Sequence, residues 1–293
     1  MKRILITGTS GMLGSSLSLA LSKRYNVFGT DNSINSLPIK FKLFDLSSKS
    51  YKELIDWAKP EIIIHCAALT DGNFCEINFQ DAFNINGYSV KKLLDSTDDN
   101  VKIIYISTDA VFSSKLNLAK ETDNKVPENI YGKSKELGEF FLINSNRNYL
   151  ILRTTIVGIN VNNLNNGFVE WILSTVKNNQ NVTLFTDVLF NPISIWDFIE
   201  EIIFLVKSNK YYNNIFHLCG TEPVTKYRFG IELIEEFNLN KDFIIKSKIS
   251  EFKARAKRST DQTMDCSKYI NLTNRTLPKL SETIKSIKLN YNV

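Results

Sequence analysis

A short glycine-rich turn near the N-terminus constrains the fold of this chain more than any other feature. Gly8, Gly11 and Gly14 recur at three-residue spacing. They directly follow the apolar run Arg3–Thr7 and lead into an amphipathic segment. Glycine allows sharp turns and close approach of two backbone segments. This order predicts a buried strand, a tight turn and a helix whose first N–H groups are available to a phosphate.

Short apolar runs alternate with longer amphipathic segments through the first half of the chain. The runs are nearly continuous, which is typical of strands that are buried on both faces of a parallel sheet. We expect strands at Arg3–Thr7, Asn26–Thr30, Lys40–Phe44, Ile62–Cys66, Lys102–Ser107 and Tyr149–Arg153, and helices at Met12–Lys23, Lys49–Ala58, Gln80–Asp95 and Asn129–Leu142. The pattern predicts an α/β fold with a doubly wound parallel sheet, the Rossmann fold.

The pattern is less regular beyond Thr154. The asparagine-rich stretch 160–166 predicts a loop. Further on we expect helices at Phe168–Val176, Ile195–Lys207, Lys226–Phe237 and Pro278–Ile287, with strands at Val182–Phe185 and Ile215–Cys219. The proline of the last helix suits a first turn. We therefore expect a core over 1–155, to which 191–215 returns, and a smaller C-terminal α/β region built from 156–190 and 216–293.

Charge and cysteine content exclude several classes of protein. The 293 residues carry 36 basic and 31 acidic side chains, with no long basic stripe, so we expect no nucleic-acid partner. The four cysteines form no Cys-x-x-Cys pair, which predicts reduced, mostly buried thiols and no metal site. The first apolar run is too short for a signal peptide, and no stretch approaches the roughly 20 apolar residues of a membrane span. We expect a cytoplasmic protein with no membrane partner.

The glycine turn predicts the phosphate end of a dinucleotide site. Gly8 allows the sharp turn, Gly11 lets the backbone approach a pyrophosphate, and Gly14 lets the helix pack closely on the strand. The position of the turn between a first strand and a first helix makes this interpretation more specific than the glycines alone. The residues predicted to contact the cofactor here are Gly8, Ser10, Gly11, Met12 and Leu13.

Residues at later strand ends predict the rest of the cofactor site. Asp31 follows the turn by about twenty residues, where a carboxylate can accept hydrogen bonds from the adenosine ribose; the alternative is that it only starts a turn. No cation stands at 32–36, so we expect NADH in preference to NADPH, with NADPH possible. Asp45 and Leu46 are predicted near the adenine, and the small Ala67 and Ala68 beneath the cofactor. His65, before them, is expected to be a core histidine.

A tyrosine and a lysine four residues apart share one helical face, where an ammonium can stabilise a phenolate. The spacing occurs twice, at Tyr131 with Lys135 and at Tyr88 with Lys92. Ligands in an open α/β sheet bind beyond the carboxyl ends of the strands. The fifth strand delivers Thr108 to that edge, and Tyr131 opens the next helix. We therefore predict Thr108, Tyr131 and Lys135 as catalytic residues and treat Tyr88 with Lys92 as a surface coincidence.

The chemistry of a hydride transfer assigns a role to each of these three groups. Reduction of a carbonyl carbon creates an alkoxide, which needs a proton donor and hydrogen bonds already in place. Tyr131 is predicted to give the proton and Thr108 to orient the substrate carbonyl. Lys135 is predicted to lower the tyrosine pKa and to hold the nicotinamide ribose.

With these residues in hand, the chain resembles the extended short-chain dehydrogenase/reductases, and within them the dTDP-4-dehydrorhamnose reductase family of nucleotide-sugar enzymes. The resemblance covers nearly the whole chain. It rests on the segments His65–Asp71, Ile104–Phe112, Tyr131–Glu139, Leu152–Thr154, Phe190–Ser194, His217–Gly220 and Lys226–Gly230. It implies a C-terminal region that binds substrate, with Asn191 and Arg258 joining Thr108 and Tyr131 as substrate-binding residues.

The same resemblance implies reduction of the 4-keto group of a nucleotide-linked deoxysugar, feeding surface polysaccharide synthesis, in a possible homodimer. Three positions depart from the family: Ala110 replaces a tyrosine, Gly72-Asn73 replaces Val-Asp, and Ser259 replaces a proline. The identity of the sugar and of the nucleotide is left open. Two alternatives also stay open: a nucleotide-sugar epimerase that retains its NAD, and a non-catalytic nucleotide-binding regulatory subunit similar to that of methionine adenosyltransferase.

Overall fold

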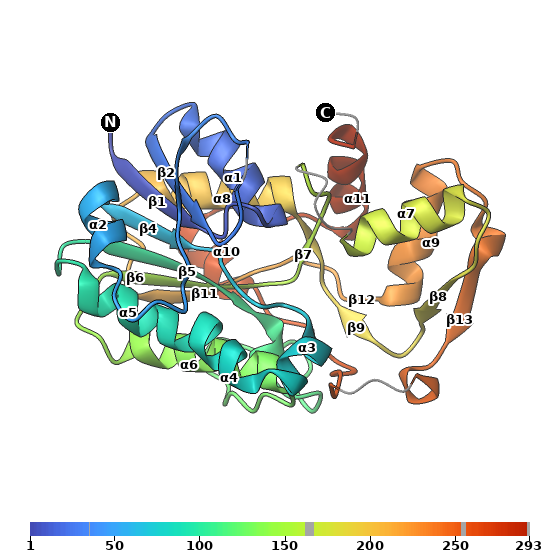
Figure 1. Cartoon of the computed structure of the whole chain (residues 1–293). Helices are drawn as coiled ribbons and strands as arrows, with labels where there is room; N and C mark the ends of the chain where they lie inside the picture. The colour runs from blue at the N-terminus through green and yellow to red at the C-terminus, as the bar shows by residue number, and fades with distance from the viewer. Residues whose placement is uncertain (35, 162–166, 253–255, 292–293) are drawn as a thin grey trace.

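Seven parallel strands form one sheet at the centre of the computed structural model, in the order β11-β6-β5-β4-β1-β2-β3 (Figure 1). The structure describes residues 1–34, 36–161, 167–252 and 256–291. The strands are β1 (Arg3–Thr7), β2 (Asn26–Asp31), β3 (Lys40–Leu43), β4 (Ile62–His65), β5 (Lys102–Thr108), β6 (Tyr149–Thr154) and β11 (Asn214–Leu218). The prediction of a doubly wound parallel sheet is confirmed.

Helices cover both faces of this sheet, which explains why its strands are apolar without alternation. Ile4 and Ile6 of β1 pack in the same cluster as α1 (Met12–Ser22) and α8 (Ile195–Lys207). Leu5, between them, packs on the opposite face with α2 (Lys52–Ala58) and α5 (Ser89–Ser96). Each such fully buried side chain contributes about 1.5–3 kcal/mol of transfer free energy. An alternation of apolar and polar residues would instead indicate a sheet with one face exposed to water.

The helix expected at Gln80–Asp95 is interrupted in the structure. It consists of α4 (Phe79–Ala82), a π-helical turn η1 (Phe83–Tyr88) and α5. The wider turn brings Asn86 inward, where its amide bonds the N–H and C=O of Leu69 and the Ser134 hydroxyl, at 2.8–2.9 Å. Those tertiary contacts explain the interruption, which helical periodicity does not reveal.

The smaller region packs around its own apolar cluster, and Figure 1 shows it to the right of the sheet. Its strands pair as β8 with β13 in parallel and β9 with β12 antiparallel, and β7 pairs with β10 where the chain crosses between regions. Its elements are β7 (Ile156–Val157), α7 (Phe168–Lys177), β8 (Val182–Phe185), β9 (Leu189–Phe190), β10 (Ile193–Ser194), β12 (Val224–Thr225), α9 (Lys226–Glu236), β13 (Ile244–Ser247) and α11 (Leu280–Leu289).

Two details of the C-terminal part differ from the expectation. Met264, Cys266 and Tyr269 pack in the cluster of the central sheet, so this stretch with α10 (Ser267–Thr273) belongs to the main core and not to the smaller region. The last helix begins at Leu280, two residues after Pro278. The Pro278 carbonyl accepts a 2.9 Å hydrogen bond from Thr221 N–H, which ties the proline to a loop outside the helix.

The remaining elements are the 14-residue helix α6 (Ile130–Ile143) and four short segments, α3 (Gly72–Ile77), η2 (Asp109–Val111), η3 (Lys241–Phe243) and η4 (Ile249–Glu251). The other predicted boundaries agree within a few residues. Most of the predicted asparagine-rich loop, 162–166, lies outside the described residues. In the described ranges, no helix combines the length and apolarity needed to cross a bilayer. The four cysteines are free, as predicted, and three are buried.

Candidate active site

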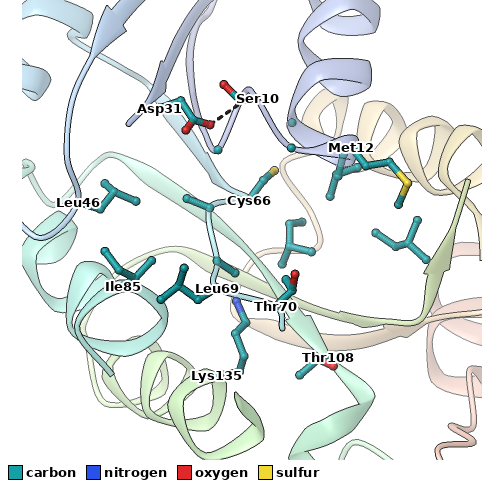
Figure 2. Close-up of a pocket in the computed structure, with 18 of the residues that line it drawn as sticks. Ser10, Met12, Asp31, Leu46, Cys66, Leu69, Thr70, Ile85, Thr108 and Lys135 are labelled. Carbon is teal, nitrogen blue, oxygen red and sulfur yellow. Dashed lines mark hydrogen bonds between the residues drawn. The ribbon is translucent and has the colours of Figure 1, made fainter. Parts of the chain in front are cut away.

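A cavity of about 670 Å³ opens along the carboxyl edge of the sheet, at the point between β1 and β4 where the strand order reverses (Figure 2). Cavities of roughly 300–1,000 Å³ at this switch point commonly hold ligands in open α/β sheets. Its walls come from the ends of six strands, the start of α1, η1, α6 and the first residue of β7. The lining residues are 8, 10–14, 30–33, 44–46, 66–70, Ile85, 106–109, Tyr131, Lys135 and 154–156.

The glycine turn has the geometry that its sequence predicts. Gly8 has a φ of +76°, and a Cβ there would lie 2.6 Å from the backbone of Ala67. A Cβ on Gly14 would lie 2.0 Å from the Gly8 carbonyl oxygen, so only glycine lets α1 start this close to β1. A Cβ on Gly11 would meet only that same oxygen, at 3.4 Å, and Gly11 lines the cavity. The turn therefore leaves open space where a phosphate would approach the helix.

Asp31 braces this turn. Its Oδ2 accepts a 2.8 Å hydrogen bond from Ser10 N–H, drawn as a dashed line in Figure 2, and its Oδ1 accepts one from Asn32 N–H. A carboxylate has about four acceptor positions, so room remains for ribose hydroxyls. Asp31 thus both caps the turn and lines the cavity.

The other predicted cofactor residues also line the cavity. Leu46, Ala67 and Ala68 face it with apolar groups. Asp45 lies beside them and accepts hydrogen bonds from the Ser47 N–H and hydroxyl, which lower the pKa of its carboxyl below the usual value. Every predicted cofactor-binding residue therefore lines the same cavity.

Thr108 and Tyr131 meet at the sheet edge. The Thr108 hydroxyl donates to Asp109 Oδ1 at 2.8 Å. Tyr131 lies close enough to Thr108 for the threonine hydroxyl to affect the pKa of its phenol. The Thr155 hydroxyl donates to the other oxygen of Asp109, at 2.7 Å. Two threonine hydroxyls therefore converge on Asp109 beside a phenol that lines the cavity.

The electrostatics keep the phenol protonated. Burial raises the pKa of Tyr131 above its ordinary value, the neighbouring Thr108 hydroxyl lowers it, and the charge of Asp109 raises it. The predicted lowering of this pKa by Lys135 is not among these effects. A neutral phenol is the form that a donor to an alkoxide requires.

Lys135 lies one helical turn after Tyr131 and is 2% exposed. Its ammonium lies 4.0 Å from the ring centroid of Tyr105, and Figure 2 shows the nitrogen directed into the cavity near Thr70. Burial lowers the pKa of Lys135 to about 7, against the opposing effect of Glu139. Lys135 is the sole basic residue that lines the cavity within the described ranges.

Close packing and a buried ion pair hold the catalytic helix in place. A Cβ on Gly132 would lie 2.2 Å from the Ala110 carbonyl oxygen, so α6 begins directly against η2. Two helical turns later in α6, the Glu139 carboxylate accepts two hydrogen bonds from the Arg153 guanidinium. It also accepts a 2.6 Å hydrogen bond from the Ser107 hydroxyl. These contacts join α6 to β5 and β6, whose ends form the site.

The competing tyrosine–lysine pair lies elsewhere. Tyr88 is 44% exposed and packs on Phe141, while the Lys92 ammonium bonds the backbone carbonyls of Leu46 and Ser47. Neither residue lines the cavity. The surface interpretation of this pair agrees with the structure.

His65 is a satisfied core histidine, as predicted. The Ser89 hydroxyl donates to the Ile85 carbonyl and so accepts from His65 Nε2 at 3.0 Å; Nδ1 then accepts from the Thr7 hydroxyl at 2.8 Å. Burial lowers the pKa of His65 to about 3, which keeps the ring neutral. Both ring nitrogens of His65 are therefore hydrogen-bonded to core side chains behind the cavity wall.

The two further substrate-binding predictions lie outside the cavity. Asn191 is 1% exposed, and its amide N–H groups bond the carbonyls of Gly220 and Met264 at 2.8 Å, so its contacts join the two regions. Arg258 is exposed, with its guanidinium 5.4 Å from the Phe252 ring, in a separate small depression. Sequence reasoning missed Thr155 and Lys226, both of which interact with Asp109, because no local pattern distinguishes them.

A dinucleotide fits the residues present. The glycine turn would hold its phosphates, Asp31 its adenosine ribose, and Lys135 its nicotinamide ribose. No group of three His, Cys, Asp or Glu side chains suitable for a metal ion occurs within the described part of the chain. The fold and this group of side chains are those of an NAD(P)-dependent oxidoreductase of the extended short-chain dehydrogenase/reductase type.

More narrowly, the chain belongs to the family described as RmlD substrate binding domain, whose model matches residues 1–292. A dTDP-4-dehydrorhamnose reductase of Aggregatibacter actinomycetemcomitans is 32% identical over 247 residues, which cover 80% of this chain and 79% of that protein. The crystal structure of dTDP-4-dehydrorhamnose reductase from Bacillus anthracis in complex with NADP has a TM-score of 0.88 at 25% identity and covers 99% of both chains. Methionine adenosyltransferase 2 subunit beta of Danio rerio is 25% identical over 272 residues, covering 91% and 84%.

Proposed function

We propose that this protein reduces the 4-keto group of a nucleotide-linked deoxysugar with a nicotinamide dinucleotide as hydride donor. The observation that carries the proposal is that Thr108, Tyr131 and Lys135 line one cavity that begins at the glycine turn, with the lysine one helical turn after the tyrosine. The relatives named as dTDP-4-dehydrorhamnose reductases support the substrate class.

Each side chain has a defined task in this reaction. A bound nicotinamide cofactor would supply the hydride for the carbonyl carbon. Tyr131, held protonated by burial, gives its proton to the developing alkoxide, and the Thr108 hydroxyl orients the carbonyl oxygen by turning its proton from Asp109 to that oxygen. The Lys135 ammonium offsets the negative charge left on the phenol. Before substrate binds, Asp109 accepts the hydrogen bond of Thr108 and holds this side chain at the sheet edge.

We propose NADH as the preferred cofactor. Asp31 places a negative charge where the 2′-phosphate of NADPH would lie. Among the described residues of this end of the cavity, 30–33 and 44–46, no lysine or arginine offers a counter-charge. Because one relative was crystallised with NADP, the proposed preference is tested by comparing the affinities of this protein for NADH and NADPH.

Incubation with NADH and a panel of 4-keto nucleotide sugars tests the activity. We expect loss of NADH absorbance with at least one thymidine- or uridine-linked 4-keto sugar and formation of the corresponding alcohol. An epimerase would instead purify with tightly bound NAD and return the hydride, with no net oxidation of NADH. A regulatory subunit, the role suggested by the similarity to methionine adenosyltransferase subunits, would bind the cofactor without turnover. A homodimer stays a prediction from the family resemblance, and a cytoplasmic location stays a prediction from the sequence.

A further inference from the structure

Thr154, at the end of β6, has a buried hydroxyl that the proposed mechanism does not use. The residue is 6% exposed and lines the cavity. Within the described ranges its Oγ1 has no hydrogen-bond partner, a property that it shares with the hydroxyls of Ser16 and Tyr212. Of these three residues, only Thr154 lines the cavity. Its unpaired hydroxyl therefore lies beside the space that a ligand would occupy.

The energetics of this hydroxyl favour a ligand. An unpaired hydroxyl inside a protein costs free energy, because it has given up its hydrogen bonds to water. Valine has nearly the same shape as threonine and would occupy this position without that cost. A ligand that hydrogen-bonds to the hydroxyl removes the cost when it binds. Threonine at position 154 is thus unfavourable in the free protein and favourable in a complex.

Thr154 lies beside the catalytic threonine. β5 and β6 are parallel, and Thr108 is the register partner of Thr154. Ile106 and Leu152, two residues earlier in each strand, both pack in the cluster that contains side chains of α1 and α8. Because side chains two residues apart in a strand share a face, Thr108 and Thr154 lie on this same side of the sheet. The unpaired hydroxyl is therefore one strand away from the group proposed to orient the substrate carbonyl.

The position of β6 in the sheet selects one half of the cofactor. The strand order places β6 and β2 on opposite sides of β1. Asp31, the proposed adenosine-ribose site, ends β2, and the glycine turn follows β1. Figure 2 shows Asp31 and Leu46 on one side of the cavity and Met12 and Thr108 on the other. A dinucleotide with its phosphates at the turn therefore extends its nicotinamide towards the ends of β5 and β6.

The side chains at this end suit an aromatic ring with one polar substituent. Met12, Leu13, Ile106 and Ile156 line the cavity and pack in or against the apolar cluster of the central sheet. Nicotinamide is such a ring, and its carboxamide can both accept and donate a hydrogen bond. A sugar carries hydroxyls on most of its carbons and would need several polar partners here. Apolar side chains around one unpaired hydroxyl therefore favour the nicotinamide.

We propose that the Thr154 hydroxyl hydrogen-bonds the carboxamide of the nicotinamide and fixes the rotation of the ring beside Thr108. The inference rests on the proposed use of a nicotinamide dinucleotide and does not depend on which sugar is reduced. It makes Thr154 a determinant of the affinity for the nicotinamide half of the cofactor alone.

Isothermal titration of the full-length protein with NADH and with ADP-ribose tests this assignment, because ADP-ribose lacks the nicotinamide. For Thr154→Val we expect about three- to tenfold weaker binding of NADH, the effect of one neutral hydrogen bond, and unchanged binding of ADP-ribose. Thr154→Ser keeps the hydroxyl and should retain most of the NADH affinity. Without ligand, Thr154→Val should melt at the wild-type temperature or above it, because valine removes an unpaired hydroxyl.

The matched control is Thr263→Val, at a buried threonine whose hydroxyl has partners. Thr263 is 2% exposed and does not line the cavity. Its hydroxyl donates to Asp261 Oδ1 at 2.6 Å and accepts from Leu118 N–H at 2.8 Å. This variant should melt at a lower temperature because it loses both hydrogen bonds. It should bind NADH like the wild type.

Three results would overturn the inference while leaving the reductase proposal intact. The first is unchanged NADH affinity in Thr154→Val, and the second is an equal loss of affinity for NADH and ADP-ribose. The third is a fall in the melting temperature of ligand-free Thr154→Val like that of the control, which would show that the hydroxyl already has a partner inside the protein. Failure of the wild type to bind either NADH or ADP-ribose would instead overturn the proposed function, and the inference with it.

Discussion

Arg153 holds the Glu139 carboxylate through two hydrogen bonds, from Nε to Oε1 at 2.9 Å and from Nη2 to Oε2 at 2.8 Å. Both side chains are almost fully buried. Arg153 lies on β6, and Glu139 lies on the catalytic helix two turns after Tyr131. The pair therefore fixes the distance between the helix that carries the proton donor and the sheet edge that carries Thr108.

Glu139→Gln should destabilise the protein by about 3–5 kcal/mol, because it leaves the buried guanidinium without a counter-charge. Urea unfolding measures this loss. Asp95→Asn is the control, because Asp95 forms an exposed ion pair with Lys91 on a helix surface, and such pairs contribute little. Equal effects of the two substitutions would contradict the role assigned to the Glu139–Arg153 pair.

Tyr131→Phe should lower kcat by about 10²–10⁴-fold, because the alkoxide loses its proton donor. The affinity for NADH should stay close to that of the wild type, since the ring remains. Steady-state rates and fluorescence titration of NADH separate the two effects. Tyr88→Phe provides the comparison and should have near-normal kinetics; a collapse of activity there would reverse the choice between the two tyrosines.

Gly11→Ala should weaken cofactor binding, whereas Gly14→Ala should lower the stability of the fold. The added methyl group at Gly11 meets only one atom at ordinary contact distance, so the variant should fold normally and bind NADH about tenfold or more weakly. At Gly14 the same group would lie 2.0 Å from a backbone oxygen, so we expect a marked loss of thermal stability. Similar melting temperatures for both variants would show that the turn is less tightly packed than the structure describes.

Asp31→Ala should weaken NADH binding about tenfold and NADPH binding less, because only the unmodified ribose loses a hydrogen-bond acceptor while the phosphate loses a repulsive neighbour. Dissociation constants for both cofactors measure the change. Asp31→Asn keeps an acceptor for the Ser10 N–H but removes the negative charge, so it separates the effect of that hydrogen bond from the effect of the charge. A greater loss of affinity for NADPH than for NADH would mean that Asp31 does not accept hydrogen bonds from the adenosine ribose.

The value of kcat/KM should fall as the pH rises through about 7, because the buried Lys135 has its pKa lowered to about 7 and loses its ammonium charge in this range. Tyr131 stays protonated there, because its pKa is raised. Lys226 has a similarly lowered pKa, so the profile of Lys226→Gln is the control. Persistence of the alkaline fall in that variant assigns it to Lys135, and its disappearance would assign it to Lys226.

Much of the fold could be predicted because the deciding signals are local. Continuous apolar runs identify doubly covered strands, and the glycine spacing identifies the first turn. The predicted cofactor residues and Thr108, Tyr131 and Lys135 all line one cavity. The break in the helix at η1 could not be predicted, because it depends on Asn86 reaching Leu69 and Ser134 across the fold.

The sequence by itself determined the order of strands and helices, the glycine turn and the spacing of Tyr131 and Lys135, since each depends on residues within about one turn or one strand. Only the tertiary structure decided which residues surround them: Asn191 inside a backbone network, Glu139 paired with Arg153, and Lys226 opposite Asp109. These partners are far apart along the chain. Packing of whole helices against the sheet brings them together, and no spacing in the sequence encodes that distance.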